Sequence, residues 1–170
     1  MRRKSFGTWP CSIARTVDLL GDAWTMLVLR ELFYGETRFD GFATALGIPR
    51  STLTNRLGLL VDEGLVDQRE YQVDPVRHEY VLTDKGRDFF GVIAAINAWG
   101  DRWLSGEEGV PVVMRHESCG HDLDATVVCG SCDEPVRLDA VSVRPGPGYP
   151  ARVASRPDVI ERFERASRTG

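Results

Sequence analysis

The sequence predicts an α+β fold, and three observations support this prediction. Apolar residues recur at helical spacing in several segments before residue 64. Two short strand-like segments follow, separated by the turn signal Asp74-Pro75. A further helical pattern, with large apolar residues along one side, then continues to residue 104. Packed helices, a hairpin and a long final helix in this order predict a winged helix-turn-helix domain.

Four helices are expected before the hairpin, each from its apolar spacing and from a terminating residue. They are predicted over residues 13–20, 23–34, 38–46 and 49–64. A glycine closes each of them: Gly21, Gly35, Gly47 and Gly64. Thr37 is a candidate N-cap for the third helix, and Pro49 suits the first position of the fourth because its φ is already helical.

The hairpin and a last helix complete this predicted domain, which spans residues 10–105. The two strands are expected over 65–72 and 78–82. Thr83 is predicted to cap an unbroken helix over 84–104. Its apolar side carries Phe89, Phe90, Ile93, Ile96, Trp99 and Trp103. A lone peripheral helix does not usually need so much apolar area, and this surplus favours a homodimer.

Two further parts are expected after a boundary marked by Gly106, Gly109 and Pro111. The first, over 110–150, is predicted to be a small β-rich, zinc-ribbon-like appendage. Its β-rich stretches lie at 110–114, 125–129 and 140–143. The second is a C-terminal tail, 151–170, with a short helix over 157–166.

Composition and charge limit the possible functions. With 42% hydrophobic and 27% charged residues, the chain has the composition of a soluble globular protein. Its apolar stretches are too short to cross a bilayer, and its basic start lacks the apolar middle of a signal peptide, so a cytoplasmic location is expected. Residues 1–105 carry 13 Lys/Arg against 14 Asp/Glu. A DNA-binding surface must therefore be a local basic patch.

The predicted helix over 49–64 has the features of a helix that reads DNA. Its leucines at 53, 57 and 60 share one face and must point inward. The opposite face is predicted to carry Arg50, Ser51, Thr52, Asn55 and Arg56. Arginine suits guanine, asparagine suits adenine, and serine or threonine suits bases or phosphates. A solvated helix face is the alternative, but the short helix before it and the hairpin after it favour binding to double-stranded DNA.

Basic residues also gather on or beside the hairpin, where they could contact phosphate or an adjacent minor groove. They are Arg69, Arg77, His78 and Lys85. Asp74 and Glu79 dilute this patch, and some of the charges are expected to pair across the strands. Arg77, beside the turn, is the strongest candidate for a DNA contact.

Residues 10–104 resemble the HxlR-type family of bacterial winged-helix transcription regulators. The motifs that carry the resemblance are GDAWT, LTNRL, EGLV and YVLTDKG. The resemblance implies a homodimer that binds a two-fold DNA site, with the first and last helices of the domain packing across the interface. It also implies a sensory input in many members, with aldehydes, quinones and oxidants among the inputs. Neither the effector nor the direction of regulation follows from the sequence.

Cys11 lies directly before the first predicted helix. A helix N-terminus lowers a thiol pKa, and Arg15 adds positive potential, so Cys11 is a candidate sensor of oxidants or electrophiles. In some members that resemble this chain, a cysteine at this place is a sensor. The alternative is a small side chain buried at the dimer interface.

The segment HESCGHDLDATVVCGSC, residues 116–132, has the spacing of a zinc-ribbon site. His116 and Cys119 form one ligand pair, and Cys129 and Cys132 form the other, each with two intervening residues. Glycines follow the second and third ligands, where a tight turn needs an unhindered backbone. Three thiolates and one imidazole suit tetrahedral structural zinc and leave no open position for catalysis. His121 is a competing ligand with poorer spacing.

Three alternatives to zinc remain open: a redox dithiol at Cys129 and Cys132, an iron–sulfur cluster, and a ribbon that has lost its metal. The leading interpretation is a dimeric, sequence-specific transcription regulator, not an enzyme, with a structural or sensory zinc appendage. A thiol redox protein or a zinc-stabilised protein-interaction module is the second class. A solvent-open metal position or a reactive dithiol would favour the redox protein, and the polar face of helix 49–64 argues against the interaction module.

Overall fold

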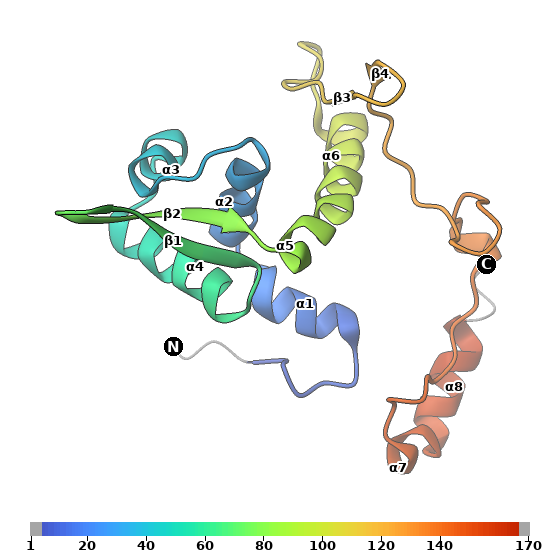
Figure 1. The fold of residues 1–170 in the computed structure, drawn as a ribbon. Coiled ribbons are helices and arrows are strands. Elements are labelled where there is room, and N and C mark those ends of the chain that lie inside the picture. The colour runs from blue at the N-terminus through green and yellow to red at the C-terminus, as the bar shows by residue number, and fades with distance from the viewer. Residues whose placement is uncertain (1–4, 167–170) are drawn as a thin grey trace.

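The computed structural model describes residues 5–166. Its first four helices begin and end within a few residues of the predicted limits (Figure 1). They are α1 (Ser12–Leu20), α2 (Ala23–Phe33), α3 (Phe39–Leu46) and α4 (Arg50–Asp62). The wing follows them, and then a helix that leads away from the core. The α+β winged helix-turn-helix fold predicted from the sequence is therefore confirmed.

Two of the predicted helix starts are wrong in detail. Thr37 is not the cap of α3, because Arg38 occupies that position and makes no side-chain capping bond. Instead, Glu36 Oε1 accepts hydrogen bonds from the backbone N–H groups of Thr37 and Arg38, at 2.8 and 2.7 Å. Pro49 lies one position earlier than predicted, as the N-cap of α4 with φ −58°. Its fixed φ still directs the chain into the helix.

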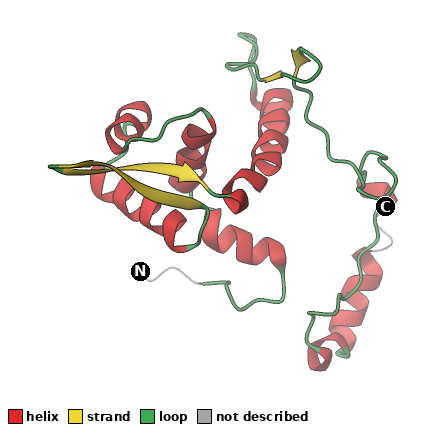
Figure 2. Cartoon of the chain, in the orientation of Figure 1, coloured by secondary structure: helices red, strands yellow, loops and turns green. Residues whose placement is uncertain are grey.

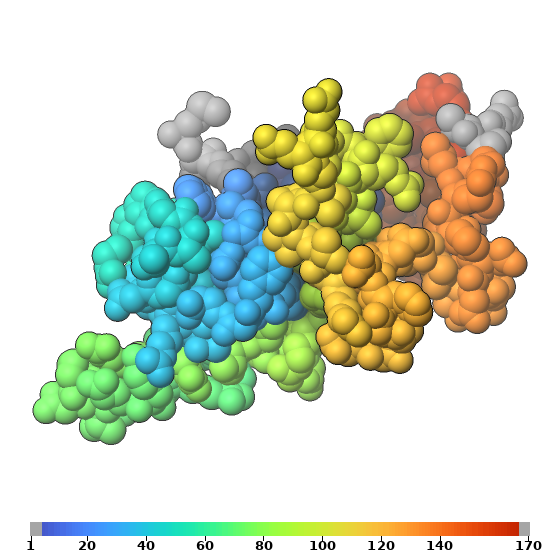
Figure 3. Space-filling model, turned by 90° about the horizontal axis from the view of Figure 1, so that it is seen from above, coloured from blue at the N-terminus to red at the C-terminus, as the bar shows by residue number. Residues whose placement is uncertain are grey.

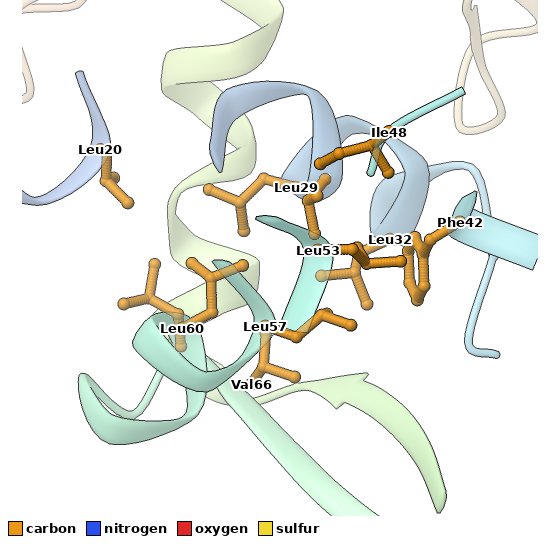
Figure 4. Packing of buried hydrophobic residues seen from close by; sticks show 11 residues of the cluster. Leu20, Leu29, Leu32, Phe42, Ile48, Leu53, Leu57, Leu60 and Val66 are labelled. Atoms are coloured by element: carbon orange, nitrogen blue, oxygen red, sulfur yellow. The ribbon is translucent and has the colours of Figure 1, made fainter. Parts of the chain in front are cut away.

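The hydrophobic core lies between α2, α3, α4 and the base of the wing (Figure 4). Leu53 and Leu57 of α4 point inward, as their spacing predicts, and pack near Leu29 and Phe42. The buried cluster consists of Leu20, Val28, Leu29, Leu32, Phe42, Ile48, Leu53, Leu57, Leu60, Leu65 and Val66. Because α4 contributes to this core along its length, its opposite side is held outward for contact with a partner.

The wing is a two-stranded antiparallel hairpin of β1 (Val66–Val73) and β2 (Val76–Leu82). Its register pairs Val66 with Leu82 and Val73 with Val76, and it is irregular at Tyr71. In Figure 2 the hairpin, in yellow, extends beyond the helices. Figure 3 shows the same hairpin, in green, projecting from one end of the molecule.

A joint of four residues, Gly64, Leu65, Thr83 and Gly86, ties both ends of the wing together. Gly64 adopts φ +68°, and the N–H of buried Leu65 bonds to the carbonyl of Leu60, so α4 ends in a Schellman turn. Thr83 returns two bonds to this turn: its N–H donates to the Leu65 carbonyl at 3.0 Å, and its hydroxyl donates to the Gly64 carbonyl at 2.7 Å. A Cβ on Gly86 would lie 2.1 Å from the Leu65 carbonyl oxygen, so only glycine fits there.

The predicted unbroken helix over 84–104 is wrong at one point. The structure divides it at Phe89 into α5 (Asp84–Asp88) and α6 (Phe90–Leu104). The N–H of Phe89 bonds to the carbonyl of Gly86, three residues earlier, so the turn is tighter than an α-helix. Phe89 packs against the core, and Thr83 caps α5 by accepting from the N–H of Gly86, as predicted.

The prediction of a β-rich appendage is also corrected. The predicted strands at 110–114, 125–129 and 140–143 do not form, and most of their valines are exposed. The appendage holds a two-residue pair, β3 (Arg115–His116) with β4 (His121–Asp122), a bridge between Val128 and Pro135, and a short 3-10 turn, η1 (Leu138–Ala140). Runs of β-branched residues form strands only where a neighbouring strand pairs with them.

The tail contains α7 (Ala151–Ala154) and α8 (Pro157–Ala166), the latter as predicted. In Figure 1 an extended stretch of chain separates these two helices from the winged domain. Tyr149 and Phe163 pack edge to face at 5.6 Å, and Val159 is buried. Residues 167–170 of the predicted tail lie outside the described part of the chain. Among residues 5–166, the helices are too short or too polar to span a membrane.

Candidate functional site

The outer face of α4 presents polar side chains to solvent. Arg50, Ser51 and Asn55 are exposed, and Thr52 is half-buried. The intervening leucines at 53 and 57 are fully buried, so the orientation of the helix is fixed by the core. Ser51, Thr52 and Asn55 therefore lie on the side of α4 away from the buried leucines, where a helix in the major groove would present them to base edges, and Arg50 is exposed at the start of the helix.

Arg50 is placed by two contacts with α3. Its Nη1 donates to Asp40 Oδ1 at 2.7 Å, and its guanidinium stacks on the Phe39 ring, 4.7 Å from the centroid. Both charged side chains are more than two thirds exposed, so the pair contributes little to stability. The stacked guanidinium is nevertheless held at the start of the reading helix, where it can exchange Asp40 for a phosphate or a guanine.

Arg56 lies differently from the prediction. It does not share the exposed face, because its side chain is only 29% exposed and its Nε lies 3.2 Å from Asp22 Oδ1. The N–H is not aligned for a hydrogen bond, and the contact is an ion pair. Asp22 is the N-cap of α2 and also accepts from the N–H of Thr25 at 3.1 Å. Arg56 therefore fastens α4 to α2, and we assign it a positioning role.

The basic residues of the wing fall into two groups. Arg77 is exposed near the tip, opposite Gln72 in the register. Arg69 and Lys85 are already engaged with the protein: Arg69 lies 3.9 Å from Asp67, and Lys85 donates to the carbonyl of Glu63 beside the joint, while His78 is half-buried opposite Glu70. Arg77 thus remains the best placed of these residues for contact with a DNA backbone.

Arg38 is a further candidate for contact with DNA, and the sequence alone did not indicate it. Its guanidinium lies over the Tyr71 ring of β1, 4.6 Å from the centroid, and its backbone forms an isolated bridge to Glu79 of β2. It is exposed, and it joins the start of α3 to the wing. Nothing in the local sequence signals this role, because Tyr71 is more than 30 positions away along the chain.

Replacing Arg77 by alanine is expected to weaken DNA binding without much sequence bias. A phosphate contact contributes about one released counterion, so the slope of log K against log salt should fall by about one. Fluorescence anisotropy titrations at several salt concentrations, on specific and random duplexes, measure this. Arg69→Ala is the matched control because Arg69 faces Asp67 on the same hairpin. An unchanged slope for Arg77→Ala would remove Arg77 from the interface.

Cys11 is the N-cap of α1, and its sulfur accepts from the N–H of Ala14 at 3.5 Å. The thiol is exposed, which argues against burial within this chain. Its sensing role stays a prediction. The test is the rate of alkylation of Cys11 in the native protein, which should be faster than that of a model thiol.

The cysteine–histidine segment forms two similar turns. In the first, the N–H groups of Cys119 and Gly120 bond to the His116 carbonyl, at 3.2 and 2.8 Å. In the second, Cys132 and Asp133 bond in the same way to the Cys129 carbonyl, at 3.3 and 2.8 Å. Each turn ends in a left-handed residue, Gly120 with φ +74° and Asp133 with φ +59°. Gly120 therefore has the predicted role, whereas Gly130 does not adopt such a φ.

The side chains of each pair meet within their own turn. His116 Nδ1 lies 3.3 Å from Cys119 Sγ. Two ligands at about 2.0 and 2.3 Å on a tetrahedral zinc ion would be about 3.5 Å apart, so this pair is close to a ligating arrangement. Within residues 5–166, however, no three His, Cys, Asp or Glu side chains converge as a metal site would require. The two pairs are each formed but are not brought together.

The thiol of Cys129 has a lowered pKa. The backbone N–H of Ser131 points at its sulfur, and the side chain and N–H of Cys132 add to this effect. These hydrogen bonds stabilise the thiolate, which is the form that binds metals and reacts with electrophiles. Both thiols of the second turn are exposed.

The buried helical core, the outward polar face of α4 and the two-stranded wing with exposed Arg77 define a winged helix-turn-helix DNA-binding protein. The HxlR-like helix-turn-helix family model matches residues 19–108. The HTH-type transcriptional regulator Rv3095 of Mycobacterium tuberculosis is 46% identical over 144 residues, covering 85% of this chain and 91% of that protein. The regulator sll1512 of Synechocystis is 42% identical over 98 residues, covering 57% and 73%. The chain belongs to the HxlR-like family and is a DNA-binding transcriptional regulator.

Solved structures agree with this assignment. PA1607, described as a candidate transcription factor, superposes with a TM-score of 0.74 at 31% identity, covering 83% of this chain and 99% of that one. The redox regulator HypR, in its reduced form, has a TM-score of 0.52 at 27% identity and covers 55% of this chain and 96% of its own. The similarity to PA1607 thus extends beyond the winged domain, whereas that to HypR covers little more than half of the chain.

Proposed function

We propose that this regulator acts as a homodimer on a two-fold symmetric DNA site. The observation that carries the proposal is an apolar stripe on α6, which consists of Val92, Ile96, Trp99 and Trp103. These residues recur at helical spacing and are 46–68% exposed. Ile13 and Val17 form a second exposed apolar pair on α1. An exposed stripe of this length on one copy is suited to pack against the same surface of another.

Substituting glutamate for Trp99 and Trp103 together is expected to convert the dimer to a monomer, because two charges would be buried at the centre of the interface. Sedimentation equilibrium measures the mass, and the affinity for a two-fold site should fall toward that for a half-site. Leu138→Glu is the control, since Leu138 is 81% exposed in the appendage and far from α6 in sequence. A wild-type monomer that binds a single half-site would overturn the proposal.

We infer further that the appendage binds one structural zinc ion per chain through His116, Cys119, Cys129 and Cys132. The support is the matched geometry of the two turns and a donor set of three thiols and one imidazole. Since the two pairs lie on separate turns, closing the site requires the segment between them to bring the turns together. The ion would supply order that the exposed valines of the appendage cannot supply by burial.

Zinc analysis of His116→Ala and His121→Ala tests this inference. Both residues lie on the first hairpin, but only His116 is proposed as a ligand, so His116→Ala should weaken zinc binding at least about ten-fold and His121→Ala should not. Chelation of the wild type should expose three further thiols to titration and leave the helical signal of the winged domain largely unchanged. Protein that is isolated without zinc and takes up none on titration would refute the site.

A further inference from the structure

A cavity of about 150 Å³ lies between α2 and α6, on a part of the molecule that the DNA-reading face does not use. Its walls are mainly apolar: Phe33 and Phe90 pack edge to face with their ring centroids 5.1 Å apart, and Ile93 lies beside them. Met114 covers it from the segment that enters β3. The backbone of Met114 is fixed because its carbonyl accepts from the N–H of Leu123 at 2.7 Å.

The cavity is partly open to solvent, since Tyr34, Phe90 and Ile96 in its lining are 38–51% exposed, and its volume suits an occupant of about one six-membered ring. An apolar cavity of about 150 Å³ in another protein stays dry and binds benzene. Aromatic walls favour a flat, polarizable ligand, since ring pairs gain energy beyond the burial of area. A methionine in the wall can adjust to the outline of such a ring.

Two polar side chains at the cavity set the chemistry of the substituent. Arg30 lies over the Tyr34 ring, but its guanidinium is already paired with the buried carboxylate of Glu31. Asn97 donates its amide N–H to Asp101 at 2.6 Å, which leaves its carbonyl oxygen to accept. A ligand carboxylate would add a second negative charge beside Glu31, whereas a hydroxyl can donate to Asn97 and accept from Arg30.

We propose that this cavity is a binding site for an uncharged single-ring aromatic compound that carries one oxygen substituent. Phenol is the smallest example. Ile96 contributes to both the cavity and the proposed dimer stripe, so the site lies where an occupant can affect how two copies meet. In that respect it rests on the proposed homodimer, but binding itself requires one chain.

Methionine methyl groups report on binding directly. Two methionines of the chain, Met26 and Met114, line the cavity. In NMR spectra of ¹³C-methyl-methionine protein, phenol should shift the Met26 and Met114 signals saturably. A ligand of seven heavy atoms should bind with a dissociation constant on the order of 0.1–1 mM. Benzoate, which has the same ring and a negative charge, should bind at least about ten-fold more weakly.

Variants separate this site from other surfaces. Ile93→Phe fills the cavity and should weaken phenol binding at least about ten-fold, whereas Leu104→Phe, at the exposed end of α6 and outside both the cavity lining and the dimer stripe, should not. If Ile93→Phe perturbs the fold, Met114→Ala removes a half-exposed cover and should also weaken binding. The site would be overturned if phenol caused no saturable shift up to about 10 mM, or if Ile93→Phe and Met114→Ala bound phenol as tightly as the wild type. Benzoate binding as tightly as phenol would overturn the ligand class.

The remaining rival occupant is a second copy of the chain. Phenol should therefore also be titrated into the Trp99→Glu, Trp103→Glu variant. Equal binding by this variant supports a ligand site within one chain, whether or not the dimer proposal holds. Binding by this variant alone, with none by the wild type, would assign the cavity to the subunit interface instead.

Discussion

Asp22→Ala is expected to lower the free energy of unfolding by about 2–4 kcal/mol. Asp22 caps α2 through the N–H of Thr25 and faces Arg56 of the reading helix at 3.2 Å. Loss of an N-cap costs about 0.5–2 kcal/mol, and an Arg left partly buried without its partner adds a cost below the 3–5 kcal/mol of a fully buried pair. Chemical denaturation, followed by circular dichroism, measures the sum.

A double-mutant cycle separates the cap from the ion pair. Asp22→Asn keeps a good capping side chain and removes the charge, and Arg56→Met keeps most of the packed length of the side chain. We expect the two substitutions to be coupled by about 1–2 kcal/mol. Single-mutant effects that add within about 0.3 kcal/mol would show that the ion pair contributes nothing. Arg56→Ala, at a position that the sequence places on the exposed face of helix 49–64, is expected to destabilise the domain because it removes the ion pair with Asp22.

Asn55→Ala is expected to reduce affinity for the specific site by about 1–3 kcal/mol, roughly five-fold to 150-fold, with little effect on random duplex. Asn55 is exposed on the outward face of α4, between the buried Leu53 and Leu57, so its removal should not disturb the core. An asparagine in the major groove can bond both N6 and N7 of adenine. Anisotropy measurements on a duplex and on its adenine-substituted variants would locate the base that it reads.

The control for this substitution lies on the same helix. Asp62→Asn alters an exposed side chain in the last turn of α4, away from the reading residues, and removes one negative charge. It should change affinity for specific and random DNA by the same factor, because such a charge acts on phosphate and not on bases. If Asn55→Ala behaves in the same way, Asn55 does not read a base.

The winged domain was predictable because the signals that define it are local. A stripe of leucines orients α4, and left-handed Gly47 and Gly64 end two helices, which are properties of a few consecutive residues. The division at Phe89 was not predictable, since it depends on contact with the core. The appendage was mispredicted for a related reason: β-branched runs indicate strands, but the structure gives most of them no partner.

The reading face could be predicted only in part. Exposure of Arg50, Ser51 and Asn55 follows from helical periodicity. The inward turn of Arg56 does not, because Asp22 is 34 positions earlier and belongs to another helix. The same holds for Arg38 and Tyr71, which meet only when the wing folds against α3. The spacing of the cysteines predicted both turns correctly, and whether they share an ion depends on chain outside the turns.

The joint at Gly64, Leu65, Thr83 and Gly86 has a consequence for regulation. It fixes the end of α4 against the start of α5, and α6 continues from α5 through a single tight turn. The end of the reading helix is thus connected to the proposed dimer helix through these hydrogen bonds and one tight turn. If two copies meet along α6, the packing of the two α6 helices sets the distance between the two α4 helices. A small change in the angle between the α6 helices then changes the distance between the α4 helices. Both α4 helices can enter the major groove of one duplex only when this distance matches the helical repeat of DNA.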